Sequence, residues 1–156
     1  MTDLIKNNQD NKTFDKSNGI DRFYGEEADH VYKPVEKIYM PVTTPKCMVA
    51  VKEKKDQLKK DQLLKNDLIR DMILDLYFSK SGSYYEKLYQ EGLVIDKLRL
   101  EQYLEESFGF AAIGGSTTKP EEFGDKVKEM LLSIKNDPIK QEEFERAKKK
   151  KYGELI

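Results

Sequence analysis

The chain has 156 residues, 38% hydrophobic and 37% charged, a composition typical of one soluble globular domain. Its 28 basic and 29 acidic side chains nearly cancel, which excludes a strong overall field that would attract nucleic acid or an anionic membrane. The single cysteine, Cys47, excludes an internal disulfide and a zinc site built from cysteines.

Residues 1–34 are predicted to form an irregular N-terminal arm, followed by a single α+β domain over residues 35–156. The arm is rich in Asn, Asp, Lys and Gly, and such a stretch buries too little apolar surface to offset its ordering entropy. Because the first residues are polar and no apolar run is long enough to span a membrane, we expect a cytoplasmic protein. Glu26, Asp29 and His30 are interpreted as solvated side chains, with a metal site as the alternative.

Two stretches after the arm have strand-like composition. Residues 35–42 end at the break Thr43-Thr44-Pro45. Residues 47–51, Cys-Met-Val-Ala-Val, are a continuous apolar run, which predicts a central strand buried on both faces. Cys47 is then interpreted as a small buried hydrophobe.

Two helices are predicted next. The first covers residues 64–77, because its apolar side chains recur every three or four residues. Its stripe consists of Leu64, Leu68, Ile69, Met72, Ile73, Leu76 and Tyr77. The second covers residues 84–89 and ends at Gly92, since glycine readily adopts the left-handed conformation that closes a helix.

A hairpin follows the short helix. Residues 98–104 alternate between apolar and polar, which predicts a half-buried strand. Gly109 turns the chain, and residues 110–113 are predicted to return as a fully buried strand that Gly114-Gly115 ends.

The C-terminal part is predicted to be helical. Pro120 within Thr118-x-x-Glu121 indicates a helix start with a capping box. This helix carries an apolar stripe of Phe123, Val127, Met130, Leu131 and Ile134. Asp137-Pro138 predicts the start of a last helix that continues to the chain end, so we expect a piece of a longer protein. The basic run at residues 148–151 is interpreted as a solvated face that complements the helix dipole, with nucleic-acid contact as the alternative.

Three motifs carry a resemblance to a known family. They are Tyr85-x-x-Leu88-Tyr89-x-Glu91-Gly92-Leu93, then Phe108-Gly109-Phe110, then Gly114-Gly115 before a helix that begins with proline. In this order, from about Lys37 to the C-terminus, the sequence resembles the second, non-catalytic half of the shorter bacterial pitrilysin/insulinase-type zinc peptidases. The resemblance implies an α+β fold with helices on one face of a mostly antiparallel sheet, the LuxS/mitochondrial-processing-peptidase-like metallohydrolase half. It also implies two halves that face each other around a chamber for an unfolded peptide.

The chemistry of such a peptidase requires His-x-x-Glu-His and a further Glu around zinc. This chain has one histidine, His30, so we expect no cofactor here and zinc only in the missing half. Cys47 has no histidine partner that we can place, and no serine lies in a Gly-x-Ser-x-Gly motif. Ser116 after Gly114-Gly115 is interpreted as part of a turn, with an anion site as the alternative.

The candidate substrate-binding residues are Tyr84, Tyr85 and Tyr89. Tyr85 and Tyr89 are four residues apart and so share one helix face. The resemblance implies that an Arg near position 89 contacts the peptide, whereas this chain has Tyr89 there. The alternative is that all three rings pack between helix and sheet.

The predicted function is that of a non-catalytic C-terminal-half domain that supplies chamber wall and peptide-binding surface. Its expected partners are the catalytic half-domain and an extended peptide, with a homodimer as a further arrangement. The alternative is a free-standing module that binds a protein or peptide through a sheet edge or a tyrosine-lined groove. An autonomous enzyme of another class has no supporting motif.

Overall fold

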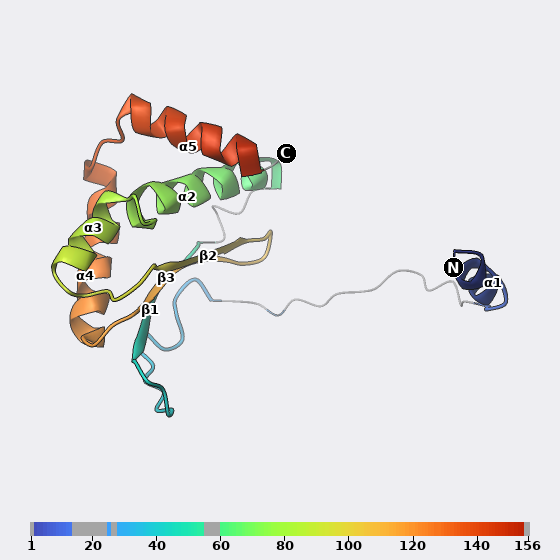
Figure 1. The fold of residues 1–156 in the computed structure, drawn as a ribbon, viewed down its shortest axis with the longest axis horizontal. Coiled ribbons are helices and arrows are strands. Elements are labelled where there is room, and N and C mark those ends of the chain that lie inside the picture. The colour runs from blue at the N-terminus through green and yellow to red at the C-terminus, as the bar shows by residue number, and fades with distance from the viewer. Residues whose placement is uncertain (1, 14–24, 26–27, 55–59, 155–156) are drawn as a thin grey trace.

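The computed structural model describes residues 2–13, 25, 28–54 and 60–154, which form an α+β fold (Figure 1). The elements in chain order are α1 (Thr2–Asp10), β1 (Lys46–Lys52), a 3-10 turn (Lys60–Gln62), α2 (Leu63–Phe78), α3 (Ser83–Gln90), β2 (Arg99–Leu104), β3 (Gly109–Ser116), α4 (Pro120–Ser133), a second 3-10 turn (Ile134–Asn136) and α5 (Gln141–Glu154).

The three strands form one antiparallel sheet in the order β1-β3-β2. The predicted hairpin of β2 and β3 is confirmed, but β3 continues through Gly114-Gly115 instead of ending there. These glycines allow close packing, because a Cβ on Gly115 would lie 2.9 Å from the Leu98 side chain. The interpretation of β1 as a central strand is wrong: among the described strands it pairs only with β3, and Val49 is its one fully buried residue, with Cys47 partly buried against the core.

Alternate residues of the strands point to opposite faces of the sheet. On one face Val49, Ile113 and Leu100 lie side by side in neighbouring strands, and this face packs into the hydrophobic core. The buried core cluster contains Val49, Leu74, Tyr77, Phe78, Tyr84, Leu88, Leu93, Val94, Leu98, Ile113, Phe123, Val127 and Met130.

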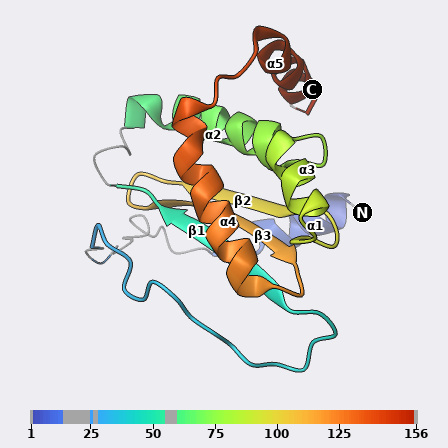
Figure 2. The same cartoon turned by 90° about the vertical axis from the view of Figure 1, so that its left-hand side faces the viewer.

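The helices of the domain lie on one face of the sheet, as predicted (Figures 1 and 2). α4 contacts β1, α2 contacts β2, and α3 packs against α2 and α4. α5 lies over α2 and so forms an outer layer. The arrangement is a two-layer α+β unit with a second helical layer over part of it.

The predicted apolar stripe of α2 differs from the observed one. Leu64 is 72% exposed and Ile69 44% exposed, whereas the buried residues are Leu74, Tyr77 and Phe78. Of the predicted stripe, Tyr77 is buried and Ile73 and Leu76 pack against the core, so the spacing identified part of the buried side. Leu74 and Phe78 were not in the stripe; they are buried because α3, α5 and β2 contact α2 from different directions.

Gly92 closes α3 as predicted. It has φ +66°, the Gly92 N–H donates to the Tyr89 carbonyl, and the Leu93 N–H donates to the Leu88 carbonyl. These bonds form a Schellman motif. Its apolar contact partners, Leu88 and Leu93, are both buried, so the turn fixes the chain as it leaves the helix.

Two predicted helix starts are corrected. α4 begins at Pro120, but Lys119 is its N-cap and no side chain caps the helix, so the Thr118–Glu121 capping box does not form. Instead, the buried Thr117 hydroxyl accepts a hydrogen bond from the Lys119 N–H at 3.0 Å. α5 begins at Gln141 and not at Asp137-Pro138, because Asp137 ends the preceding 3-10 turn.

The described part of the N-terminal arm contains one helix. Residues Thr2–Asp10 form α1, in which every residue is exposed, whereas no helix was expected there. Residues 35–42 form no strand, although their composition predicted one, and all of them are exposed. β-branched side chains alone do not make a strand when no neighbouring strand is available to pair with it.

Candidate functional site

The structure separates the three predicted tyrosines. Tyr84 is 2% exposed, and its ring lies 4.8 Å from that of Tyr77 and 5.4 Å from that of Phe78. Its hydroxyl is 3.0 Å from the Ser133 hydroxyl. Burial raises the pKa of Tyr84 above its usual value, so the ring stays neutral. Tyr84 therefore belongs to the core and offers no surface to a peptide.

Tyr85 and Tyr89 lie on the other face of α3 and stack on each other. Their ring centroids are 6.2 Å apart with an interplanar angle of 17°. Tyr85 is half-buried against the core, whereas Tyr89 is 58% exposed. Beside them, Glu91 at the end of α3 pairs with Lys126 of α4 at 3.4 Å. The stacked Tyr85 and Tyr89 rings therefore form an accessible aromatic surface on the helical side of the domain.

A second apolar surface lies on the sheet face opposite the helices, which we call the helix-free face. In the described part of the chain no helix packs on it. Tyr103 of β2 is 55% exposed and lies opposite Phe110 of β3, with ring centroids 5.2 Å apart. Met48 of β1 is 52% exposed, and its Cε would lie 3.1 Å from a Cβ on Gly114. Met48 thus lies over a glycine at one end of this sheet face, and the Tyr103–Phe110 pair lies at the opposite end.

Charged side chains also lie on the helix-free face, because the register places Arg99, Glu101 and Lys52 on the same side as its exposed apolar residues. Arg99 and Glu101, which alternate with the inward-facing residues of β2, form an ion pair. At the end of β1, the Lys52 ammonium donates to the Ala28 carbonyl at 2.6 Å. Charged and apolar side chains therefore mix across this face, with Lys52 directly beside Phe110 and Glu101 in the middle row. Protein-binding surfaces commonly combine apolar and polar side chains.

The sequence contained a signal for this face that the prediction did not use. Tyr103 stood out among the polar positions of its strand, Arg99, Glu101 and Glu105. Phe110 was assigned to a fully buried strand, whereas it is only partly buried and points away from the helices. A large aromatic residue at a position of solvent-facing parity is the pattern that could have located the face.

The structure brings together no catalytic group at the other predicted positions. Among the described residues, no group of three or more His, Cys, Asp or Glu side chains could hold a metal ion. His30 is exposed, and Glu26 lies outside the described residues. Burial raises the pKa of the Cys47 thiol even though Lys128 opposes this shift, so the thiol is a poor nucleophile at neutral pH. Ser116 Oγ is 3.5 Å from Asp96 Oδ2, a position unsuited to an anion site.

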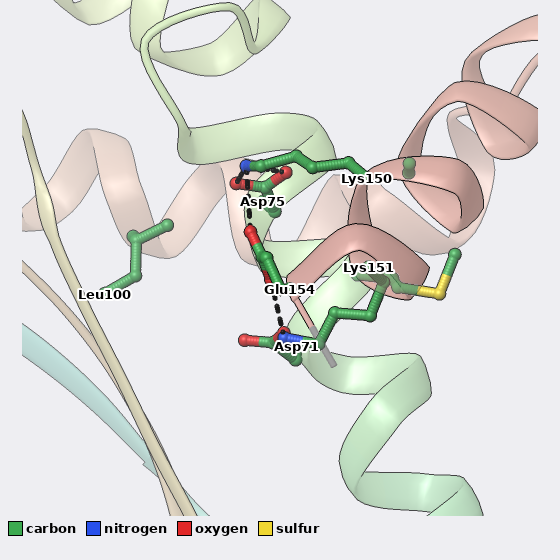
Figure 3. Close-up of a pocket in the computed structure, with 8 residues that line it drawn as sticks. Asp71, Asp75, Leu100, Lys150, Lys151 and Glu154 are labelled. Atoms are coloured by element: carbon green, nitrogen blue, oxygen red, sulfur yellow. Dashed lines mark hydrogen bonds and ion pairs between the residues drawn. The ribbon is translucent and has the colours of Figure 1, made fainter. Parts of the chain in front are cut away.

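The basic run at the end of α5 is partly neutralised. Lys150 pairs with Asp75 at 2.8 Å, and Lys151 pairs with Asp71 (Figure 3). Both partners are on α2, so these lysines connect two helices. The search for membrane spans, made over the described residues, found no helix with the length and apolar character required. The cytoplasmic location stays a prediction.

Comparison with known proteins identifies the family. Residues 1–151 match the family model described as the peptidase M16 inactive domain. This chain belongs to that family. It is 34% identical over 152 residues to the zinc protease YmfH of Bacillus subtilis (strain 168), a match that covers 97% of this chain and 35% of YmfH. A crystal structure of an M16-like peptidase from Alicyclobacillus acidocaldarius has 27% identity and a TM-score of 0.77, over 99% of this chain and 36% of that one.

Membership in this family confirms the resemblance to the non-catalytic half of these peptidases and the predicted α+β fold class. It also extends the resemblance toward the N-terminus. The M16 match begins at residue 1, so the arm before Lys37, which no motif had placed, belongs to the matched region. The M16 inactive domain spans about a third of the length of the two relatives. The activity of such larger proteins is therefore a separate question from the fold of this domain.

Proposed function

We propose that this M16 domain is the non-catalytic C-terminal-half domain of a zinc metallopeptidase-like protein and forms part of a chamber wall that binds extended peptides. In this arrangement a catalytic half supplies the zinc ion, the attacking water and the general base. The observation that supports the proposal is the helix-free face, where the adjacent Tyr103 and Phe110 rings at one end and Met48 at the other expose apolar side chains among charged residues.

The chemistry of this face suits an unfolded peptide of varied sequence. Aromatic rings offer a large contact area at low cost in side-chain entropy. The flexible, polarisable Met48 side chain adapts to different partners. Contacts of this kind give modest affinity with little sequence preference, which is what a chamber wall requires.

The proposal is tested by peptide binding to the 156-residue chain. A labelled, unstructured peptide is titrated with wild type and with the double variant Met48→Ser, Tyr103→Ser, and fluorescence anisotropy is measured. We expect binding about tenfold weaker in the variant, because two exposed contact side chains are lost. Thermal unfolding should change little, since both side chains are more than half exposed.

The matched control is Tyr85→Ala, Tyr89→Ala, which removes the aromatic pair on α3. Under the proposal this variant binds the peptide like wild type. If the α3 pair loses binding while the sheet-face pair keeps it, the peptide site lies on the helical side and the proposal is wrong. Absence of peptide binding by wild type also overturns it.

The alternative of a free-standing interaction module has the stacked pair of Tyr85 and Tyr89 in its favour, because these rings are accessible without a second domain. Sedimentation of wild type over a range of concentrations distinguishes the two functions. Self-association that the Tyr85→Ala, Tyr89→Ala variant abolishes would favour the module.

A further inference from the structure

α5 is attached to the domain by little apolar contact. Ala147 is the one residue of this helix that is buried, whereas Phe144 and Tyr152 are 39% and 59% exposed. Helices in proteins are normally stabilised by burying a continuous apolar stripe. α5 buries no such stripe, so other interactions must hold it against α2.

Those interactions are ion pairs between the two helices (Figure 3). The Lys150 ammonium donates to both carboxylate oxygens of Asp75 at 2.8 Å, and the Lys151 ammonium pairs with Asp71. Glu154 lies between the lysines, 3.9 Å from Lys150 and 3.2 Å from Lys151. The hydrogen bond that Lys151 donates to Asp71 is the main cause that raises the pKa of Lys151 above its usual value. We call these five residues the α2–α5 clasp.

The clasp surrounds a hollow that dissolved ions can reach. The hollow has a volume of about 180 Å³ and also touches Met72 of α2 and Leu100 of β2. A second hollow of about 240 Å³ shares Asp75, Ala147 and Lys150 with the first and is also lined by Leu76. Such volumes accommodate several water molecules each. Ion pairs in contact with water are screened by salt, whereas tightly packed apolar contacts are not.

The segment that connects the second 3-10 turn to α5 is attached to the core where it begins, at Asp137. The Tyr77 hydroxyl donates to the Asp137 carbonyl at 2.7 Å, which fixes the end of the 3-10 turn to the core. Residues 138–140 then lead to α5 without helical structure. A fixed point followed by a short irregular segment is the arrangement expected of a hinge.

We propose that α5 is an electrostatic latch that opens from α2 as a separate unit while the sheet and α2–α4 remain folded, and that salt promotes this opening. Opening uncovers apolar side chains of two elements, Met72 and Leu76 of α2 and Leu100 of β2. Proteins open locally in cooperative units, and the units with the fewest buried apolar contacts open most easily. The latch is independent of the proposed peptide surface, which lies on the other side of the sheet.

Hydrogen exchange of the 156-residue chain, measured by mass spectrometry at low and at high sodium chloride, tests the latch. Screening the two interhelical pairs predicts about tenfold faster exchange of the α5 amides at high salt, because ion pairs in contact with solvent weaken as the ionic strength rises. Exchange of the β3 and α4 amides should not accelerate. Equal acceleration of α5 and β3, or no acceleration of α5, would overturn the proposal.

A pair of matched variants assigns the effect to the clasp. Lys150→Gln, Lys151→Gln breaks both interhelical pairs and should show fast α5 exchange already at low salt. The control Lys148→Gln, Lys149→Gln removes the same charge from the same helix at two exposed neighbouring positions. Lys and Gln have similar helix propensity, so both variants leave the intrinsic helicity of α5 alike. If the control exchanges as fast as the clasp variant, net charge and not the clasp holds α5, and the proposal is wrong.

Discussion

Tyr84 and Tyr89 show how one helix gives the same residue type two different roles. Helical spacing correctly predicted that Tyr85 and Tyr89 share a face, which their stacked rings confirm. By the same spacing Tyr84 shares a face with Leu88, and this second face is the buried one. The sequence could not decide between the two faces, because the decision depends on where α2 places Tyr77 and Phe78.

Alanine substitutions should separate these roles in chemical denaturation. Tyr84→Ala is expected to lower the free energy of unfolding by about 3–5 kcal/mol, because it leaves a large cavity and removes a buried hydrogen bond. Tyr89→Ala should lower it by less than about 1 kcal/mol, since the side chain is largely exposed. Equal effects of the two substitutions would show that the burial difference is not maintained in solution.

At the scale of elements, the sequence predicted most of the helices and strands correctly. It predicted less well how these elements pack against one another. The helices and strands between residues 46 and 133 were found, because periodicity and the glycines and prolines that end elements are local signals. The place of β1 at the sheet edge was missed, since an apolar run looks the same in an edge strand and a central one. The buried side of α2 was identified only in part, at Ile73, Leu76 and Tyr77, because three neighbours, α3, α5 and β2, contact the helix from different directions.

Met72 and Ile113 were both predicted to be core residues, and the structure assigns them different environments. Ile113 is 1% exposed in the central strand, whereas Met72 is partly buried and lines the hollow beside the α2–α5 clasp. Ile113→Asp should therefore abolish cooperative thermal unfolding, because an unpaired charge in the core costs several kcal/mol.

Met72→Asp is expected to leave a folded domain with a lower melting temperature. Its carboxylate can be solvated by water in the hollow and lies near the ammonium groups of Lys150 and Lys151. Circular dichroism melting curves of both variants check the pair of expectations. A Met72→Asp variant that is unfolded at room temperature would contradict the solvated environment described for this side chain.

For the whole molecule, the resemblance carried information that periodicity did not. Spacing and turn residues supported an α+β unit, but they did not indicate that its helix-free face would carry exposed apolar side chains. Exposed apolar side chains gathered on one face are typical of interaction sites. This chain spans about a third of the length of its two M16 relatives.

The last prediction concerns zinc and proteolysis by this chain alone. A catalytic zinc site of this family type needs two histidines and a glutamate with an open position for water, and His30 is the one histidine in the sequence. We therefore expect less than about 0.1 equivalent of zinc by elemental analysis of the purified, untagged chain, and no chelator-sensitive cleavage of a quenched peptide substrate. A His30→Asn variant serves as the control: any residual zinc that it retains is bound without a histidine and is adventitious. Zinc near one equivalent in wild type, lost in the variant together with peptide cleavage, would show that the domain builds an active site of its own and would overturn its assignment as the non-catalytic half.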